Sequence, residues 1–122
     1  MSHILVVDDD QAIRDISGKI LGRAGYDLAL ANTAEEGLEK CAATRFDLVV
    51  TDLSLPGMSG ARFSEVLLER HPKLKILIFS GLLTSAHDGM SQSVLARPGL
   101  HFLAKPFRPK ELLLAVEAIL VG

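Results

Sequence analysis

The sequence contains a single cysteine, Cys41, and no tryptophan. One cysteine cannot form an internal disulfide bond, and it excludes a metal site built from several thiolates. A free cysteine usually packs as a small hydrophobic residue. We therefore predict that Cys41 lies in the core and carries no chemistry.

The sequence also lacks an excess of basic charge. Its 13 Lys and Arg residues stand against 15 Asp and Glu, which gives a formal net charge of −2. We therefore expect neither a nucleic-acid surface nor a membrane surface in this chain. No apolar run approaches the ~20 residues of a membrane span, and the run at residues 4–7 is too short for a signal peptide. These absences predict a cytoplasmic protein.

Hydrophobic residues make up 48% of the 122 residues, which is enough to build the core of one domain over residues 1–122. Short apolar runs predict strands at residues 4–7, 27–31, 48–51, 75–79 and 100–104. Apolar residues at helical spacing follow these runs. Alternating strands and helices indicate βαβ crossovers, and therefore an α/β fold with a parallel five-stranded sheet.

The first two expected helices have clear start signals. Asp10 can cap the first, because a carboxylate near a helix N-terminus accepts hydrogen bonds from free amides. Thr33 and Glu36 form a capping box before the second, in which each side chain bonds the other's backbone N–H. Spacing predicts the buried faces: Ile13, Ile16, Ile20 and Ala24 in the first helix, and Ala34, Leu38, Cys41 and Ala42 in the second.

The later helices are less uniform. The third is expected to begin at Ser59 and Gly60 and to end before Pro72. The last has Pro109 in its first turn, where proline is well tolerated. Residues 82–99 are poor in helix formers. Any helix between the fourth and fifth strands is therefore expected to be short or shifted.

Four of the five expected strands end at residues that can do chemistry. They are Asp8 and Asp9, Asp52, Ser80 and Lys105. In a parallel sheet these ends share the edge where ligands bind. Carboxylates held together there repel each other, and a hard cation such as Mg²⁺ relieves that repulsion. Asp52 is the best candidate nucleophile, because carboxylates can form acyl phosphates.

The segments at these strand ends resemble the receiver domain of two-component response regulators. They are residues 4–10 (ILVVDDD), 50–60 (VTDLSLPGMSG), 80–81 (SG) and 102–107 (FLAKPF), and the similarity extends from residue 3 to about 121. The resemblance implies a flavodoxin-like (βα)5 fold with strand order 2-1-3-4-5 and helices on both faces of the sheet. It also implies a phosphorylation-dependent switch that is no enzyme, catalysing only its own phosphorylation and slow self-dephosphorylation.

By this resemblance, Asp52 is the phosphoacceptor and takes its phosphoryl group from a phosphohistidine. The partner would be a sensor histidine kinase or a histidine phosphotransfer domain. Asp9, Asp52 and the backbone carbonyl of Ser54 would bind Mg²⁺ directly, and Asp8 would bind it through a water. Arg14 is interpreted as a solvated surface residue, on the helix where the family usually docks its kinase.

The resemblance also assigns the switch. Lys105 and Ser80 would bind the phosphoryl oxygens, and Ser80 and Phe102 would move on phosphorylation. The surface of the fourth helix, fifth strand and fifth helix would then report the change to an output domain or a downstream protein. The peptide bond between Lys105 and Pro106 is expected to be cis. No feature of the sequence indicates an oligomeric state.

Two side chains near the phosphoacceptor are predicted to set the lifetime of the phosphorylated state. They are Ser54, two residues after Asp52, and Leu82, two residues after Ser80. Hydrolysis needs a water in line with the phosphorus, and a leucine side chain cannot hydrogen-bond that water. We therefore predict slow to moderate self-dephosphorylation.

Two other functions stay open at this point. A phosphohydrolase of the haloacid dehalogenase type also uses an aspartyl phosphate with Mg²⁺, and Asp8 and Asp10 have its Asp-x-Asp spacing. That interpretation leaves the Asp52 segment unexplained, and the chain is too short for the usual substrate cap. The other alternative is a scaffold that binds partners without phosphorylation. The presence of all five strand-end residues argues against it.

Overall fold

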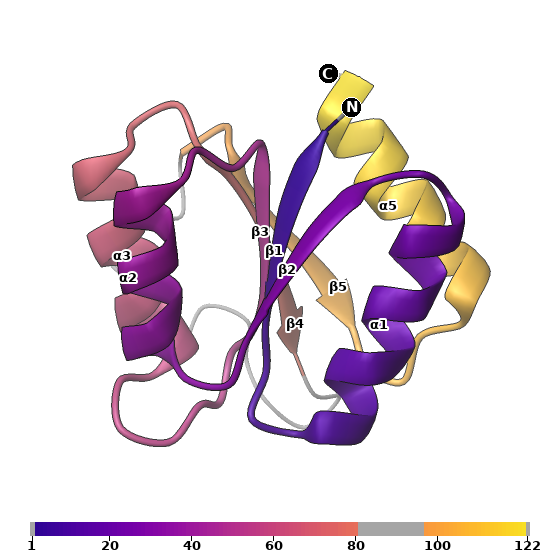
Figure 1. Ribbon diagram of the computed structural model, residues 1–122, viewed down its shortest axis with the longest axis horizontal. Helices are drawn as coiled ribbons and strands as arrows, with labels where there is room; N and C mark the ends of the chain where they lie inside the picture. The colour runs from indigo at the N-terminus through magenta and orange to yellow at the C-terminus, as the bar shows by residue number, and fades with distance from the viewer. Residues whose placement is uncertain (1, 81–96, 122) are drawn as a thin grey trace.

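A computed structural model describes residues 2–80 and 97–121. The described elements, in chain order, are β1 (His3–Val7), α1 (Gln11–Arg23), β2 (Asp27–Ala31), α2 (Ala34–Ala43), β3 (Leu48–Asp52), α3 (Gly60–Arg70), β4 (Lys75–Ser80), β5 (Leu100–Ala104) and α5 (Pro109–Val121). The five strands are parallel in the order β2-β1-β3-β4-β5 (Figure 1). The predicted fold class and strand order are confirmed. Residues 82–96, most of the irregular segment, lie outside the described part of the chain.

Helices cover both faces of the sheet, with α2 and α3 on one face and α1 and α5 on the other (Figure 1). This arrangement explains why the central strands are continuous apolar runs, since both of their faces are buried. Alternate strand residues therefore enter two cores. Leu5, Val7, Val49, Ile76 and Ile78 pack with Phe63 and Leu67 on the first face. Ile4, Val6, Val50 and Leu77 pack with Leu21, Leu112 and Val116 on the second.

The predicted helix caps form, with one difference. The Asp10 carboxylate accepts hydrogen bonds from the N–H groups of Ala12 and Ile13 at 2.9 and 3.4 Å. Thr33 Oγ1 accepts from the Glu36 N–H at 3.1 Å, so half of the capping box is present. The other half is wrong.

The Glu36 carboxylate bonds the N–H of Asn32 at 2.8 Å, and not that of Thr33. Side chains on a helix point back toward its N-terminus. The Glu36 side chain therefore extends past Thr33 and reaches Asn32, the first residue after β2. The carboxylate therefore ties the β2–α2 loop to helix α2.

The predicted buried faces of α1 and α2 are partly wrong. Ile16 is 51% exposed, and Ser17 and Leu21 are buried in its place. At 3.6 residues per turn the buried stripe centres near Ser17, so Ile16 lies on its flank. Ala24 is the exposed C-cap of α1, and Ala42 is exposed in the last turn of α2.

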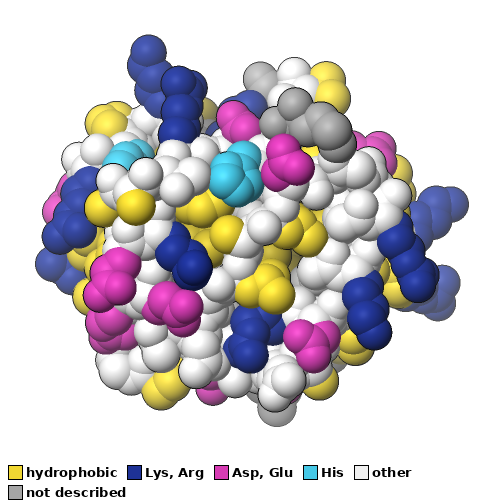
Figure 2. Space-filling view, viewed as in Figure 1, with side chains coloured by type: hydrophobic (Ala, Val, Ile, Leu, Met, Phe, Trp, Pro, Cys, Tyr) yellow, Lys and Arg dark blue, Asp and Glu magenta, His cyan; other side chains and the backbone are white. Residues whose placement is uncertain are grey.

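The face of the molecule crossed by β2 carries both hydrophobic and charged side chains. Figure 2 shows hydrophobic side chains along the middle of this face, with Lys, Arg, Asp and Glu interspersed around them. Leu30 of β2, which is 38% exposed, belongs to this edge strand. In the described part of the chain no helix has the length and apolarity needed to span a membrane.

Cys41 is buried on α2, as predicted, with 7% of its surface exposed. Burial raises the pKa of its thiol to about 11. Because the thiolate is the reactive form, we expect iodoacetamide at pH 8 to alkylate the native protein roughly a hundredfold more slowly than the protein in concentrated urea. Mass spectrometry of timed samples measures both rates. Equal rates would show that Cys41 is accessible in the native state.

Candidate functional site

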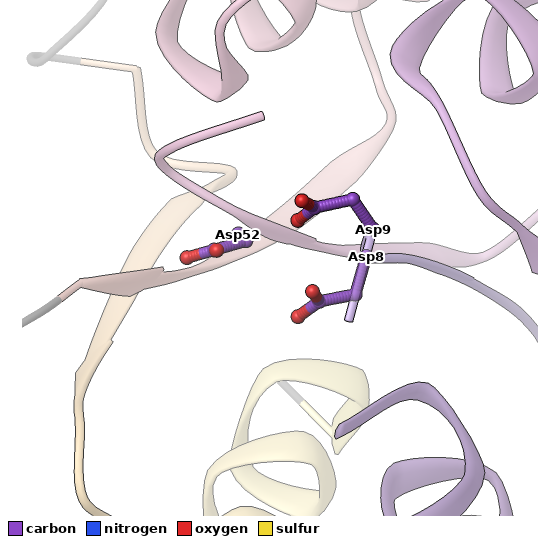
Figure 3. Close-up of side chains that lie close together, drawn as sticks. All are labelled: Asp8, Asp9 and Asp52. Carbon is purple, nitrogen blue, oxygen red and sulfur yellow. The ribbon is translucent and has the colours of Figure 1, made fainter. Parts of the chain in front are cut away.

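Three carboxylates meet at the carboxyl edge of the sheet. Asp8 and Asp9 follow β1, and Asp52 ends β3, the strand paired with β1. One oxygen from each carboxylate lies within 4.8 Å of the other two. Figure 3 shows the three side chains extending to the same side of their backbones, with the carboxylates around a shared space. The pairing of β1 with β3 is what brings the two segments together.

Lys105 adds a positive charge to this group. Its Nζ lies 3.2 Å from Asp52 Oδ1 and 4.0 Å from Asp8 Oδ2. Its backbone N–H donates to the Ser80 carbonyl at 2.7 Å, which holds the start of the β5–α5 loop against the end of β4. The Lys105–Pro106 peptide bond is cis, as the resemblance implied. The lysine therefore reaches across β4 to the carboxylates.

Asp8 is the most buried member of the site, with 1% of its surface exposed. Its Oδ1 accepts a hydrogen bond from the Asp10 N–H at 2.9 Å, whereas its Oδ2 has no hydrogen-bond partner among residues 2–80 and 97–121. Burial raises the pKa of the Asp8 carboxyl above its ordinary value. The Asp10 N–H and Lys105 oppose this shift, and the charges of Asp52 and Asp9 add to it.

The donor set fits a hard divalent cation. A buried carboxylate oxygen without a partner is unfavourable, and Asp8 Oδ2 is such an atom beside two further carboxylates. Mg²⁺ prefers carboxylate and carbonyl oxygens and uses few protein ligands. The arrangement can therefore hold a cation between acidic groups, with an ammonium beside it that can pair with a second anion.

The other predicted site residues lie around this group. Ser80 is buried at the end of β4, opposite Ala104 of β5. Phe102 is half-buried on β5 and packs against the first core. Ser54 is exposed in the loop after β3. Leu82 lies outside the described residues.

Arg14 was predicted to be a solvated surface residue, and the structure corrects this. Its Nη1 donates to the backbone carbonyl of Asp8 at 2.7 Å and to Oδ1 of Asn32 at 2.9 Å. The reason is geometric: Arg14 follows Asp10 by one turn of α1, and its long side chain returns to the end of β1. Periodicity could not have found it, because the acceptors come from two separate loops.

Gly60 is the second residue that the sequence analysis missed. It was predicted only as the start of a helix, and α3 does start there with Ser59 as its N-cap. However, a Cβ added at Gly60 would overlap the carbonyl of Asp52, and would lie 2.8 Å from Leu53 Cα. A glycine directly after a helix cap and close to a strand end was the available signal. Gly60 lets α3 approach the end of β3.

Comparison with known proteins places this geometry in a family. The family model described as "Response regulator receiver domain" matches residues 4–117. The chain is 35% identical to the Bacillus subtilis alkaline phosphatase synthesis transcriptional regulatory protein PhoP, covering 96% of this chain and 48% of PhoP. It is 35% identical to the response regulator MprA of Mycobacterium leprae, covering 97% and 50% of the two. The chain thus spans about half the length of these curated relatives.

Solved structures agree. A CheY-like receiver domain protein from Methanospirillum hungatei superimposes with a TM-score of 0.88 at 32% identity, covering 99% of this chain and 94% of that one. The chemotaxis response regulator CheY4 of Vibrio cholerae gives 0.84 at 29% identity, covering 98% of both. The family model, the curated relatives and the solved structures therefore agree on a receiver domain, and this is not a classical enzyme family. This chain belongs to the response regulator receiver domain family.

Proposed function

We propose that residues 1–122 act as one receiver domain, a cytoplasmic phosphorylation-dependent switch in which Asp52 is the phosphoacceptor. A sensor histidine kinase or a histidine phosphotransfer domain supplies the phosphoryl group. One observation carries the assignment to Asp52: its Oδ1 lies 3.2 Å from Lys105 Nζ, beside the Asp8 and Asp9 carboxylates. A nucleophile for phosphoryl transfer needs positive charge near the oxygens that gain negative charge.

The transfer is a displacement at phosphorus. An Asp52 oxygen forms a bond to the phosphorus, and the bond from phosphorus to the histidine nitrogen breaks. Its electron pair stays with the imidazole, which carries a proton on its other ring nitrogen and so leaves as the neutral ring. The product is an acyl phosphate on Asp52. Lys105, which pairs with Asp52 before the reaction, would pair with the phosphoryl oxygens afterwards.

Asp9, Asp52 and the Ser54 carbonyl would hold Mg²⁺ directly, and Asp8 would hold it through a water. The buried Oδ2 of Asp8, which accepts no hydrogen bond within the described part of the chain, supports this assignment. When bound, the cation neutralises charge on the carboxylates and on the phosphoryl group. Asp8 and Asp9 would thus bind the cation and would not act as nucleophiles.

The readout is proposed to begin at Ser80 and Phe102. Ser80 would hydrogen-bond the new phosphoryl group, and its carbonyl already holds the Lys105 N–H. Phe102 lies three residues before Lys105 on β5 and is only half-buried, so it can change position with that strand end. The surface that includes β5 and α5 would pass the change to an output domain or a downstream protein. Ser54 and Leu82 would control the access of water to the phosphorus, and the self-dephosphorylation would be slow.

The alternative phosphohydrolase has less support than it had from the sequence. Its Asp-x-Asp motif would need the Asp10 side chain in the site. The Asp10 carboxylate instead accepts hydrogen bonds from the first turn of α1, and Asp10 is outside the group of three clustered carboxylates. We therefore expect no turnover of a phosphate ester such as p-nitrophenyl phosphate.

The proposal is tested by intact-mass measurement after incubation with acetyl phosphate. With Mg²⁺ the expected result is an adduct of one phosphoryl group, and with excess EDTA the expected result is no adduct. Calorimetry of Mg²⁺ binding to the same sample provides the control. Mg²⁺ binding without any adduct, from either acetyl phosphate or a phosphorylated kinase, would favour the scaffold function.

A further inference from the structure

Arg14 connects the acidic site to a loop that belongs to another part of the sheet. One guanidinium nitrogen, Nη1, donates to the Asp8 carbonyl at 2.7 Å and to Asn32 Oδ1 at 2.9 Å. The Asp8 carbonyl belongs to the peptide group that joins Asp8 to Asp9. The bridge therefore acts on the backbone between two of the three clustered carboxylates.

The far end of the bridge is anchored. The Asn32 N–H donates to Glu36 Oε1 at 2.8 Å, and Thr33 caps the same helix. The Asp8 end of the bridge is also partly fixed, because the Asp8 N–H donates to the Ala31 carbonyl at 3.2 Å. Hydrogen bonds from a charged donor are shorter and stronger than neutral ones. The guanidinium can therefore restrain the peptide between Asp8 and Asp9 against helix α2.

The site needs such a restraint. Its three carboxylates repel each other, and two of them sit on adjacent residues just past the end of β1. Asp8 Oδ1 is held by the Asp10 N–H, while Oδ2 accepts no hydrogen bond from the described residues and has only Lys105 Nζ at 4.0 Å. Without a fixed backbone the repulsion would spread the carboxylates apart and lower their affinity for a cation.

We propose that Arg14 is a positioning residue, which with Asn32 holds the Asp8–Asp9 peptide in the geometry that binds a divalent cation. The inference rests on the proposed metal-binding function of the site and adds the group that preorganises it. It also makes the β2–α2 loop part of that site, although the hydrogen bonds of Asn32 within the described residues go to Arg14 and Glu36 and not to the three carboxylates.

A positioning role and a purely electrostatic role of Arg14 predict opposite changes in cation affinity when Arg14 is removed, so an experiment can distinguish them. If Arg14 acted only through its positive charge, removing it would strengthen cation binding by the carboxylates. If it acts as a restraint, removing it weakens cation binding. Loss of a group that orients metal ligands typically costs tenfold or more in affinity. For Arg14→Ala we expect Mg²⁺ to bind roughly tenfold more weakly.

The experiment is calorimetric titration of the metal alone, Mg²⁺, into five variants and the wild type. Arg14→Lys keeps the charge and one donor nitrogen, and it should fall between wild type and Arg14→Ala. Asn32→Ala should weaken binding by a smaller factor. The double variant Arg14→Ala/Asn32→Ala should be no weaker than Arg14→Ala, because both changes remove one bridge. Arg23→Ala removes an exposed positive charge from the same helix and should bind like the wild type.

A second readout needs no metal. The bond from Arg14 to the Asp8 carbonyl polarises the peptide group that includes the Asp9 N–H. Arg14→Ala should therefore shift the Asp9 amide resonance in metal-free NMR spectra, and Asn32→Ala should shift it in the same direction. Melting temperatures of all variants show whether they fold. If Arg14→Ala does not fold, Arg14→Lys and Asn32→Ala still test the proposal.

The outcomes separate the two proposals. A wild type that binds no Mg²⁺ overturns the proposed metal site itself. A wild type that binds Mg²⁺, together with an Arg14→Ala that binds equally well or more tightly, overturns the positioning role alone. Equal weakening by Arg14→Ala and Arg23→Ala would also overturn it, because the effect would then not depend on the bridge.

Discussion

Asp52→Asn is expected to abolish phosphoryl labelling by acetyl phosphate in the presence of Mg²⁺. The amide has the shape of the carboxylate but no negative charge and no nucleophilic oxygen, so no acyl phosphate can form on it. The packing around residue 52 should survive, because Thr51 and Leu53 are buried on either side and the change is nearly isosteric. Intact-mass measurement should show no adduct under conditions that label most of the wild type.

Asp10→Asn provides the matched control for this prediction. It removes one carboxylate from the same run of aspartates. Asparagine caps helices about as well as aspartate, so the bonds to the Ala12 and Ile13 amides should persist. We expect this variant to be labelled at close to the wild-type rate. If the adduct instead persisted on Asp52→Asn, the nucleophile would be elsewhere, and Asp8 would be the next candidate.

The acidic site could be predicted from sequence because its members sit at strand ends. A parallel sheet brings the carboxyl ends of its strands to one edge whatever the details of packing. Asp8, Asp9 and Asp52 were therefore expected on the same edge once the alternation of strands and helices was recognised, and the pairing of β1 with β3 makes them neighbours. The strand order itself came from the family resemblance, since periodicity says which segments are strands and not which strands are neighbours.

Side chains that bond to backbone groups could not be predicted in this way. Arg14 bonds the carbonyl of Asp8, and Glu36 bonds the N–H of Asn32. Both backbone groups are invisible in a sequence pattern, because every residue has a carbonyl and nearly every residue has an N–H. The exposed position of Ile16 has a different cause: hydrophobic spacing locates the buried stripe of a helix to within about one residue, and Ile16 lies at its margin.

Gly60 shows how the fold and the site depend on one position. The Gly60 N–H donates to the Leu53 carbonyl at 2.8 Å, so the first turn of α3 touches the backbone just after Asp52. A methyl group there would overlap the Asp52 carbonyl, which is backbone and cannot turn aside as a flexible side chain would. We expect Gly60→Ala to lower the free energy of unfolding by about 1–3 kcal/mol, the range typical of overpacking. Its labelling by acetyl phosphate should also slow, because relief of the overlap must move Asp52 or α3.

Gly18→Ala is the matched substitution with the opposite expected sign. Gly18 lies inside α1, where a Cβ would meet Leu30 Cδ2 at 3.6 Å, an ordinary van der Waals distance. Alanine is the better helix former, so this variant should gain about 0.5–1 kcal/mol. Urea denaturation followed by far-UV circular dichroism measures both changes. If Gly60→Ala were as stable as Gly18→Ala, helix propensity would outweigh the contact, and α3 would not need a glycine to pack against the end of β3.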